Sequence, residues 1–543
     1  MKKRVFSAIM ATLPLTLFGQ TAIDAYQLSR YDLKGTARFM SMGGAFGALG
    51  GDLSTLNQNP GGIGVYRKSD IGITLDIDIQ NAKTNTPVMS YNQKQTKVGV
   101  NNVGYVGATR TNSEIMPFFN WGFTYNRAAS FNRRFRGVDV MNGSLSNYIA
   151  GYTSAENWTT QELEGTDKNY FSAYGAPWMS MLAYNSYMIN PVSPGSTTYN
   201  GLWGNGTSGE HEFDVEETGY VDEYEINLGG NFSDVVYWGI GFGITDINYN
   251  QNIYYQEFLS NATIPIVQQN GDENAVVASP TPVATDQEVG FGLQSRKHIS
   301  GTGYNFKAGL IVRPINELRL GLAVHTPTYY NLSQNNDGIV DYGYGYADGD
   351  LKPGFHGTPI EATNWKLRTP WRLMASAAVV IGPKAIISAD YEYRPYQSMT
   401  TKFDNGENAE YINDDIKNYY KAANIIRIGA EYRVNNHISI RAGYAYESSP
   451  TGAEVKENKI PVYTSSPNDT GTTPSYTLDN STRFITCGLG YKYKNFYADA
   501  AYVNKHSTSD FHPYSPNNYT LAPTASEVSS NSNNIVLTVG FRF

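Results

Sequence analysis

The feature that most constrains the fold of this chain is a two-residue alternation of apolar and polar side chains. In segment 71–80, isoleucine or leucine stands at every second position, with glycine, threonine or aspartate between them. The closing segment 533–543 repeats the pattern and ends on the aromatic residue Phe543. Because successive side chains of a strand point to opposite faces, each segment of this kind predicts a strand with one apolar and one polar face.

The same alternation recurs along most of the chain and predicts an all-β protein. In the middle and later segments, isoleucine, alanine and tyrosine alternate with arginine, glutamate and aspartate. Fourteen strands are predicted, at residues 69–80, 99–111, 118–131, 218–233, 236–250, 300–313, 316–330, 366–381, 384–396, 422–434, 437–448, 481–493, 495–506 and 533–543.

Alternation alone also fits a soluble β-sandwich, and the lengths of the connections decide between the two. Short turns such as 233–235 join the even strands to the next odd ones. The connections that follow odd strands are long and polar, at about 132–217, 251–299, 332–365, 397–421, 449–480 and 507–532. An even strand number with short turns on one side and long loops on the other is typical of bacterial outer-membrane barrels.

We therefore predict a 14-stranded antiparallel transmembrane β-barrel in the outer membrane of a Gram-negative bacterium, with both chain termini in the periplasm. The strand that ends at Phe543 is expected to pair antiparallel with the first strand. This pairing would close the wall and remove the exposed sheet edges. The apolar faces would then meet lipid, and the charged faces would line the lumen.

Three regions divide the chain. Residues 1–20 carry three cationic residues, an apolar run and then small or polar residues, which predicts a cleavable secretory signal peptide. Residues 69–543 form the predicted barrel, including the long extracellular loop 132–217. The interior of a barrel of this size is wider than wall side chains can fill. The glycine-rich, non-alternating segment 21–68 is therefore predicted to plug the lumen.

Composition excludes several other classes of function. The formal charge of -8 becomes about -11 without the signal peptide, which argues against nucleic-acid binding. The single cysteine, Cys487, allows no intramolecular disulfide. Glycine-rich stretches lie inside strands and not before helices, and the histidines lack metalloprotease spacing. We expect no enzyme activity, no catalytic residue, no cofactor and no metal site.

The plug segment carries the motif by which the chain resembles a known family. Residues 35–64 hold a run of small residues, an acidic residue and then Asn59, Pro60, Gly61, Gly62 and Ile63. This order resembles the N-terminal hatch of the FadL/OmpP1/TodX family of outer-membrane channels, of which the chain looks like a Bacteroidetes-type member. Segments 319–330, 367–379 and 426–450 add further similarity in the same order.

The resemblance implies a fourteen-stranded barrel with an N-terminal hatch. Such a barrel passes long-chain fatty acids or other hydrophobic molecules into the membrane through a lateral opening. In the family, an Asn-Pro-Ala element of the hatch lies near an inward kink of the third strand, and by position it corresponds to Asn59 and Pro60. Gly61 replaces the alanine. Gly122 is a candidate for the kink, because glycine within a strand often marks a bulge or a close approach.

Three groups of residues are candidates for contact with cargo, and each has a structural alternative. The first long loop holds Trp178, Met179, Met181 and Tyr184, which would capture hydrophobic molecules or simply pack the loop against itself. In the plug, Phe39, Met42 and Phe46 would touch cargo or pack against the wall. In the lumen, Arg319, Arg427 and Arg441 would bind an anionic head group or neutralise carboxylates of the wall.

Two functions remain after the sequence analysis. The first is a monomeric channel for hydrophobic small molecules that contacts outer-membrane lipid and is recognised by the barrel-assembly machinery through the strand ending at Phe543. The second is a surface or secretion-associated barrel that binds proteins through its long loops. The sequence names neither the cargo nor the direction of transport.

Overall fold

The structure is a computed structural model that describes residues 21–164, 176–263, 265–267, 276–278, 288–344, 353–462, 473–515 and 524–543. The predicted signal peptide lies outside the described residues. Within them, no helix is both long enough and apolar enough to cross a membrane.

The wall is a closed 14-strand antiparallel barrel, as the alternation predicts. The first and last strands pair along their whole length, from Asp70 with Arg542 to Asn85 with Glu527, which confirms the expected closure. The wall consists of β1 (Asp70–Asn85), β2 (Ser90–Arg110), β3 (Phe118–Val140), β6 (Ser208–Phe232), β7 (Val236–Ser260), β10 (Glu288–Val312), β11 (Leu318–His325) continued by β12 (Tyr329–Tyr344), β14 (Glu361–Arg368) continued by β15 (Arg372–Ile381), β16 (Ala385–Pro395), β18 (Ala422–Arg433), β19 (Ile438–Glu447), β20 (Tyr476–Tyr493), β21 (Phe496–His512) and β22 (Ser526–Arg542).

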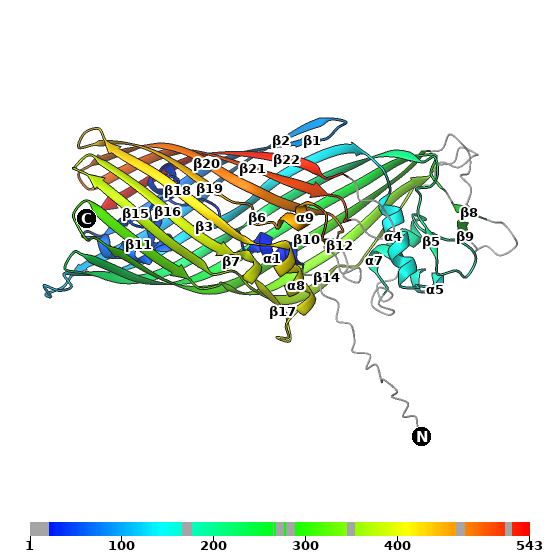
Figure 1. Ribbon diagram of the computed structural model, residues 1–543, viewed down its shortest axis with the longest axis horizontal. Coiled ribbons are helices and arrows are strands. Elements are labelled where there is room, and N and C mark those ends of the chain that lie inside the picture. Colours follow the sequence, from blue (N-terminus) through cyan, green and yellow to red (C-terminus); the bar gives the residue numbers. More distant parts are fainter. Residues whose placement is uncertain are drawn as a thin grey trace, which may run out of the picture.

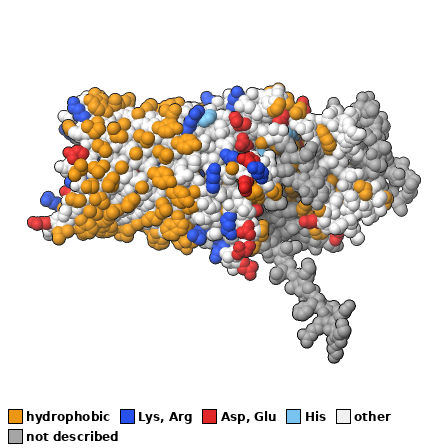
Figure 2. Space-filling view, viewed as in Figure 1, with side chains coloured by type: hydrophobic (Ala, Val, Ile, Leu, Met, Phe, Trp, Pro, Cys, Tyr) orange, Lys and Arg blue, Asp and Glu red, His pale blue; other side chains and the backbone are white. Residues whose placement is uncertain are grey.

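The two ends of the barrel differ in their connections (Figure 1). At one end, which we call the turn end, short turns such as 233–235 join the strands, and the C-terminus lies there. The long connections extend from the other end, which we call the cap end. Figure 2 shows hydrophobic side chains gathered on the outer surface near the turn end, followed by charged side chains nearer the cap end. The apolar band is therefore much shorter than the barrel.

Many strands extend beyond their predicted ends because their faces exchange polarity along their length. Near the turn end of β6, Ile226 faces outward and is 56% exposed, whereas Glu225 faces the lumen and is buried. Near the cap end of the same strand, Phe213 is buried inside, and Asp214 lies outside, paired with Arg134 of β3 at 2.6 Å. The predicted loop 132–217 is wrong at its ends for this reason, since β3 and β6 occupy its two flanks.

The described parts of the connection between β3 and β6, residues 141–164 and 176–207, form a unit that we call the cap. Its described elements are α4 (Leu145–Ala155), α5 (Thr160–Leu163), α7 (Trp178–Asn185), β4 (Asn190–Pro191) and β5 (Tyr199–Asn200). Buried cap residues such as Met181 and Leu182 form one apolar cluster with Phe213 and other inward-facing residues of the wall. The cap thus packs onto the interior of the mouth (Figure 1).

Other short elements lie between the later strands. They are β8 (Pro265–Val267), β9 (Val276–Ala278), β13 (Gly354–Gly357), η2 (Tyr396–Ser398), β17 (Thr400–Phe403), α8 (Glu410–Tyr419) and α9 (Ala453–Lys456). Helix α8 contributes Ile412 and Ile416 to an apolar cluster that also contains Tyr26 and Leu28, residues of the N-terminal segment.

Residues 21–68, which we call the plug, lie within the barrel as a series of short helices. These are α1 (Ala22–Leu28), α2 (Ala37–Ser41), α3 (Thr55–Gln58) and the 3-10 helix η1 (Pro60–Val65). The side chains of Thr21 and Thr36 cap α1 and α2 by accepting hydrogen bonds from the backbone N–H groups of Asp24 and Phe39. Nearly all residues of these helices are buried. The lumen is therefore occupied from its middle to its turn end.

Candidate functional site: the plug and the gap beside strand β3

The Asn59–Gly61 element fixes the start of η1 and holds it against the wall. The side-chain oxygen of Asn59 accepts a hydrogen bond from the N–H of Gly61 at 3.0 Å, and its amide nitrogen donates to the carbonyl of Gly47 at 2.5 Å. Pro60 stands at the first helical position, where a missing N–H costs nothing. This element packs on β7 and β10, since a Cβ on Gly61 would lie 2.9 Å from the carbonyl carbon of Gly309.

The other end of η1 meets β3. The side-chain amide of Asn120 donates to the carbonyls of Ile63 at 2.7 Å and Tyr66 at 3.1 Å. Gly122 allows the plug to approach closely, because a Cβ there would lie 2.9 Å from Cδ2 of Leu56. Gly122 itself pairs regularly with neighbours on β2 and β6. The irregular part of β3 lies further along the strand.

Strands β2 and β3 separate beyond Asn102 and Asn126. Their ladder runs from Arg110 paired with Phe118 to Asn102 paired with Asn126, and within the described residues of both strands it goes no further. Next to this point, Asn101 bulges out of the β1–β2 ladder and Ala128 out of the β3–β6 ladder. A bulge bends its strand and leaves one residue unpaired. The backbone hydrogen bonds of the wall are therefore interrupted on the cap side of Asn102 and Asn126, and we call this break in the β2–β3 ladder the gap.

The plug residue Asp32 contacts the free edge of β3. Its N–H donates to the carbonyl of the bulged Ala128 at 2.8 Å, and its carboxylate accepts from the N–H of Ser130 at 3.2 Å. The ammonium of Lys505, on β21, lies 2.5 Å from the same carboxylate. Burial alone would raise the pKa of the Asp32 carboxyl, yet Lys505 and Arg30 hold this pKa well below its usual range. Asp32 is therefore an ionised link between plug and wall.

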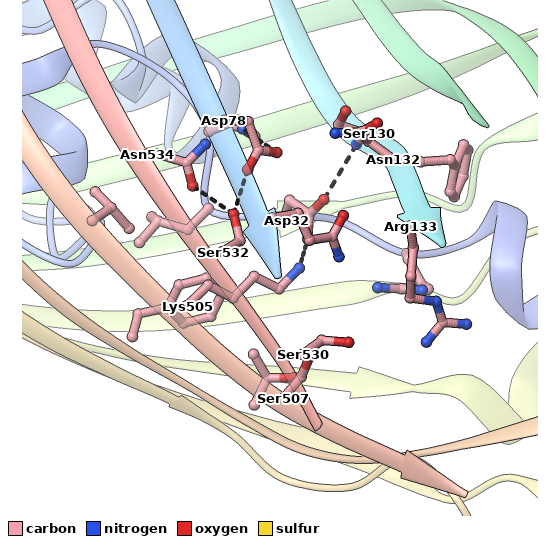
Figure 3. A pocket seen from close by; sticks show the side chains of 18 of the residues that line it. Asp32, Asp78, Ser130, Asn132, Arg133, Lys505, Ser507, Ser530, Ser532 and Asn534 are labelled. Atoms are coloured by element: carbon pink, nitrogen blue, oxygen red, sulfur yellow. Dashed lines mark hydrogen bonds and ion pairs between the residues drawn. The ribbon is translucent and has the colours of Figure 1, made fainter. Parts of the chain in front are cut away.

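A small cavity of about 60 Å³ lies behind this contact (Figure 3). Its lining combines charged groups of the plug and the wall with a few large apolar side chains. Among its lining residues are Arg30, Asp32, Leu33, Phe131, Arg133, Phe484, Val503 and Lys505.

The three candidate lumen arginines contact the plug or wall carboxylates. Arg319 donates to the carbonyl of Leu49 in the plug at 2.8 Å. Arg427 lies 2.7 Å from Glu392, and Arg441 lies 2.6 Å from both Glu431 and Asp499. In this closed arrangement, the three arginines are held by partners in the barrel interior. Arg441 also lines a cavity of about 400 Å³ near the turn end, and Arg427 lines one of about 50 Å³ beside the plug.

Phe39, Met42 and Phe46 of the plug are buried in one apolar cluster with inward-facing wall residues such as Ala445 and Val503. The guanidinium of Arg38 lies 5.2 Å from the centre of the Phe46 ring. These side chains pack the plug against β18 to β22, on the side of the lumen away from η1.

The aromatic and methionine residues of the long loop are also buried. Trp178, Met179 and Met181 are at most 2% exposed and belong to the apolar cluster of the cap. Tyr184 packs against this cluster, and its ring meets that of Tyr199 edge to face at 6.3 Å. In this conformation they close the mouth of the barrel and form no exposed capture surface.

Sequence reasoning did not find Asp32, Ser130 or Lys505. An acidic residue in a glycine-rich segment and a lysine in a polar stretch carry no periodic signal. Only the strand register and the position of the bulge in β3 bring the three together.

Comparison with known proteins identifies the family. Residues 220–541, more than half of the chain, match the family described as outer membrane protein transport protein (OMPP1/FadL/TodX). The chain belongs to this family. FadL/TodX proteins are outer-membrane barrels of Gram-negative bacteria and are transport channels, not enzymes.

The chain is similar to several solved structures at low sequence identity, and the first of them shares its fold. A FadL homologue from Pseudomonas aeruginosa is 13% identical and superimposes with a TM-score of 0.52, covering 95% of this chain and 100% of its own. The toluene transporter TodX of P. putida is 13% identical with a TM-score of 0.45, covering 94% of this chain and 99% of its own. The toluene transporter TbuX of Ralstonia pickettii is 14% identical with a TM-score of 0.42, covering 94% and 99%. No curated protein matches the chain.

Proposed function

We propose that this FadL/TodX-family barrel takes up hydrophobic small molecules of the long-chain fatty acid kind and releases them sideways into the membrane. The observation that carries this proposal is the separation of β2 from β3 beyond Asn102 and Asn126, directly in front of the plug residue Asp32. A gap that opens toward lipid lets an apolar molecule leave the lumen without crossing water. A water-filled pore would not need a gap in its wall.

The interior supplies an apolar route toward this gap. The cluster that contains Trp178 lies at the cap end, and the cluster that contains Tyr26 and Ile416 lies nearer the turn end. Because short turns of such barrels face the periplasm, we place the turn end, with Phe543, on that side. Cargo would then enter from the cap end, displacing apolar contacts that an apolar molecule can replace.

The Asn59–Gly61 element has a supporting part in this proposal. It fixes η1 across β6, β7 and β10, while the far end of η1 is held by Asn120 on β3. The element therefore anchors the plug, and residues 30–34 beside the free edge of β3 are the part that moves. Phe39, Met42 and Phe46, and the three lumen arginines, would meet cargo only after such a movement.

The alternative of a protein-binding surface barrel rests on the aromatic residues of the long loop. Those residues are buried in the cap, so that observation favours closure of the mouth instead. We therefore propose the channel alone.

Cross-linking the gap tests lateral release. A Cβ on Gly99 would lie 3.6 Å from a guanidinium nitrogen of Arg127, so side chains at these positions span the gap. In a Cys487→Ala background, Gly99→Cys and Arg127→Cys are joined with a short, reducible bis-maleimide. Uptake of a fluorescent long-chain fatty acid by cells should fall to near background and return after reduction.

The matched control places cysteines at Val103 and Tyr125, which pair within the intact part of the same two strands. Linking this control pair should leave uptake unchanged. Equal uptake by the cross-linked and the reduced Gly99/Arg127 variant would refute lateral release between β2 and β3.

A further inference from the structure

The carboxylate of Asp32, in the plug, is bound by donor groups of the wall. Figure 3 shows Asp32 between Ser130 of β3 and Lys505 of β21. The Lys505 ammonium lies 2.5 Å from one carboxylate oxygen, and the Ser130 N–H donates to the other at 3.2 Å. One cation and one backbone N–H from two different strands thus converge on a single anionic group.

Two further donors line the same cavity without a hydrogen-bond partner among the described residues. They are the hydroxyl of Ser530, a residue that is only 6% exposed, and the side-chain amide nitrogen of Asn132. Buried polar groups are normally satisfied, and an unmet donor costs free energy. Unmet donors in the cavity that Lys505 also lines indicate a site that accepts more anionic or acceptor groups than Asp32 alone supplies.

The other carboxylates of the cavity already have partners of their own. Glu217 pairs with Arg133 of the wall at 2.9 Å, and Asp479, which is 3.5 Å from Arg30 of the plug, also lies 4.0 Å from Arg133. Asp78, which is 3.9 Å from Lys34 of the plug, also accepts a hydrogen bond from Ser532 of the wall. Within the described residues, Lys505 forms its ion pair with Asp32 of the plug. It loses this partner if residues 30–34 move, whereas Glu217, Asp479 and Asp78 each keep a partner on the wall.

Apolar side chains adjoin the charged groups. Phe131, Phe484 and Val503 of the wall and Leu33 of the plug line the same cavity and are largely shielded from solvent. Ala128 and Ser130, which Asp32 contacts, are on the edge of β3 that β2 leaves unpaired. A molecule with an anionic head at Lys505 would thus have apolar contacts for its tail beside the gap in the wall.

We propose that Asp32 occupies, in the closed barrel, an anion site formed by Lys505, the Ser130 N–H, Ser530 and Asn132, and that the carboxylate of an amphiphilic cargo takes this site when the plug segment leaves. The inference rests on the proposed channel function and deepens it. Asp32 acts as an internal competitor, so release at β3 is coupled to the arrival of an anionic head group.

The test compares an acid with its ester in a competitor-free variant. Asp32→Asn keeps the size of the side chain but removes the charge that pairs with Lys505. Binding of cis-parinaric acid and of its methyl ester is measured by fluorescence on the full-length barrel in lipid nanodiscs. Because the fraction of barrel competent to bind the acid rises, the acid should bind about tenfold more tightly to D32N than to the wild type. The ester should bind about equally to both.

Two further variants serve as controls. One loosens the plug at another place, and the other removes the cation at position 505. Arg38→Gln breaks another ion pair between plug and wall, with Glu431 at 2.9 Å, away from the edge of β3. R38Q should bind the acid as the wild type does. Lys505→Met should weaken binding of the acid relative to the ester. Heat-modifiable migration on gels verifies that each barrel is folded.

Hydrogen exchange provides a readout that does not depend on cargo. The Ser130 amide should exchange faster in Asp32→Ala than in the wild type, and R38Q should leave it unchanged. An unchanged Ser130 amide in Asp32→Ala, or an equal gain of acid and ester binding in D32N, would overturn the anion site. If neither probe binds the wild type or any variant, the channel function itself fails, whatever the exchange at Ser130.

Discussion

The barrel is closed by two seals that differ in kind. The cap closes one end with apolar side chains such as Trp178 and Met181, which pack on the inward face of the extended strands. The plug also packs apolar side chains such as Phe39 against the wall, but it differs from the cap in its directional contacts to the wall. Asn59, Asp32 and Arg38 form defined hydrogen bonds and ion pairs. One seal is chiefly a hydrophobic core, whereas the other combines apolar packing with directional polar contacts.

This contrast determines which seal an apolar cargo can open. Hydrophobic contacts are non-directional, so a hydrophobic molecule can replace either partner at little cost. Hydrogen bonds and buried ion pairs lose free energy when one partner is left unmet, and an apolar molecule offers no substitute. The cap should therefore yield to any sufficiently apolar molecule, whereas the plug should yield only to one that brings a matching polar group.

Removing the central side chain of the apolar seal should change the protein more than any other substitution in either seal. Trp178 is 1% exposed and packs against Gly338 of β12. Trp178→Ala should destabilise the cap locally by about 3–5 kcal/mol, the usual cost of such a cavity. Hydrogen exchange of residues 176–190 should rise strongly. Val192→Ala, at an exposed position of the cap, should have little effect. Unchanged protection in Trp178→Ala would contradict the view that the cap is a packed core.

A smaller effect is expected where the plug backbone touches the wall. Gly309 of β10 contacts Asn59 and Gly61 so closely that a Cβ would lie 2.8 Å from the nitrogen of Gly61. Gly309→Val should cost about 1–3 kcal/mol through overpacking and should displace η1. Planar-bilayer recordings should then show larger conductance than the wild type. Gly343→Val has open space around it and is the control. Equal conductance of the two variants would show that η1 does not depend on this contact.

High salt should have a small effect on hydrogen exchange in the plug and none on exchange in the cap. At about 1 M salt the screening length is about 3 Å, so exposed charge pairs weaken while buried ones are less affected. The Arg38–Glu431 pair is partly accessible, with side chains 21% and 8% exposed. Exchange in the plug should rise by less than about threefold, the equivalent of roughly 0.6 kcal/mol. Exchange in the cap should not rise. A cap that loosens with salt would remove the distinction between the seals.

Sequence patterns predicted the wall well because lipid imposes one rule on every strand. Outward side chains such as Ile226 and Leu320 must be apolar wherever lipid covers them, so the two-residue pattern is strong there. The parts of the strands nearest the cap end were not predicted. Beyond the apolar band, Phe213 faces inward and Asp214 faces outward. The alternation persists there with its faces exchanged, which resembles a polar loop when only the membrane rule is applied.

The candidate site was less predictable because it depends on register. Asn59 and Pro60 were found from a local motif, and their packing on Gly309 and Gly239 follows from the backbone there. Asp32 and Lys505 are 473 positions apart in the chain. No local pattern records that a bulge at Ala128 leaves an edge for Asp32 to occupy.

The exchange of polarity along β6 also determines how deeply the barrel sits in the membrane. This strand has 25 residues, about 80 Å at roughly 3.3 Å per residue, whereas crossing a bilayer needs only about 9–11. Sinking the barrel deeper would draw the outward carboxylates and arginines near Asp214 into hydrocarbon, at a cost of about 2–4 kcal/mol for each cation that reaches the midplane. Lifting it would expose Ile226 and its neighbours to water. The barrel therefore has one preferred depth in the membrane. At that depth, the gap beside Asn102 and Ala128 keeps a fixed position along the membrane normal.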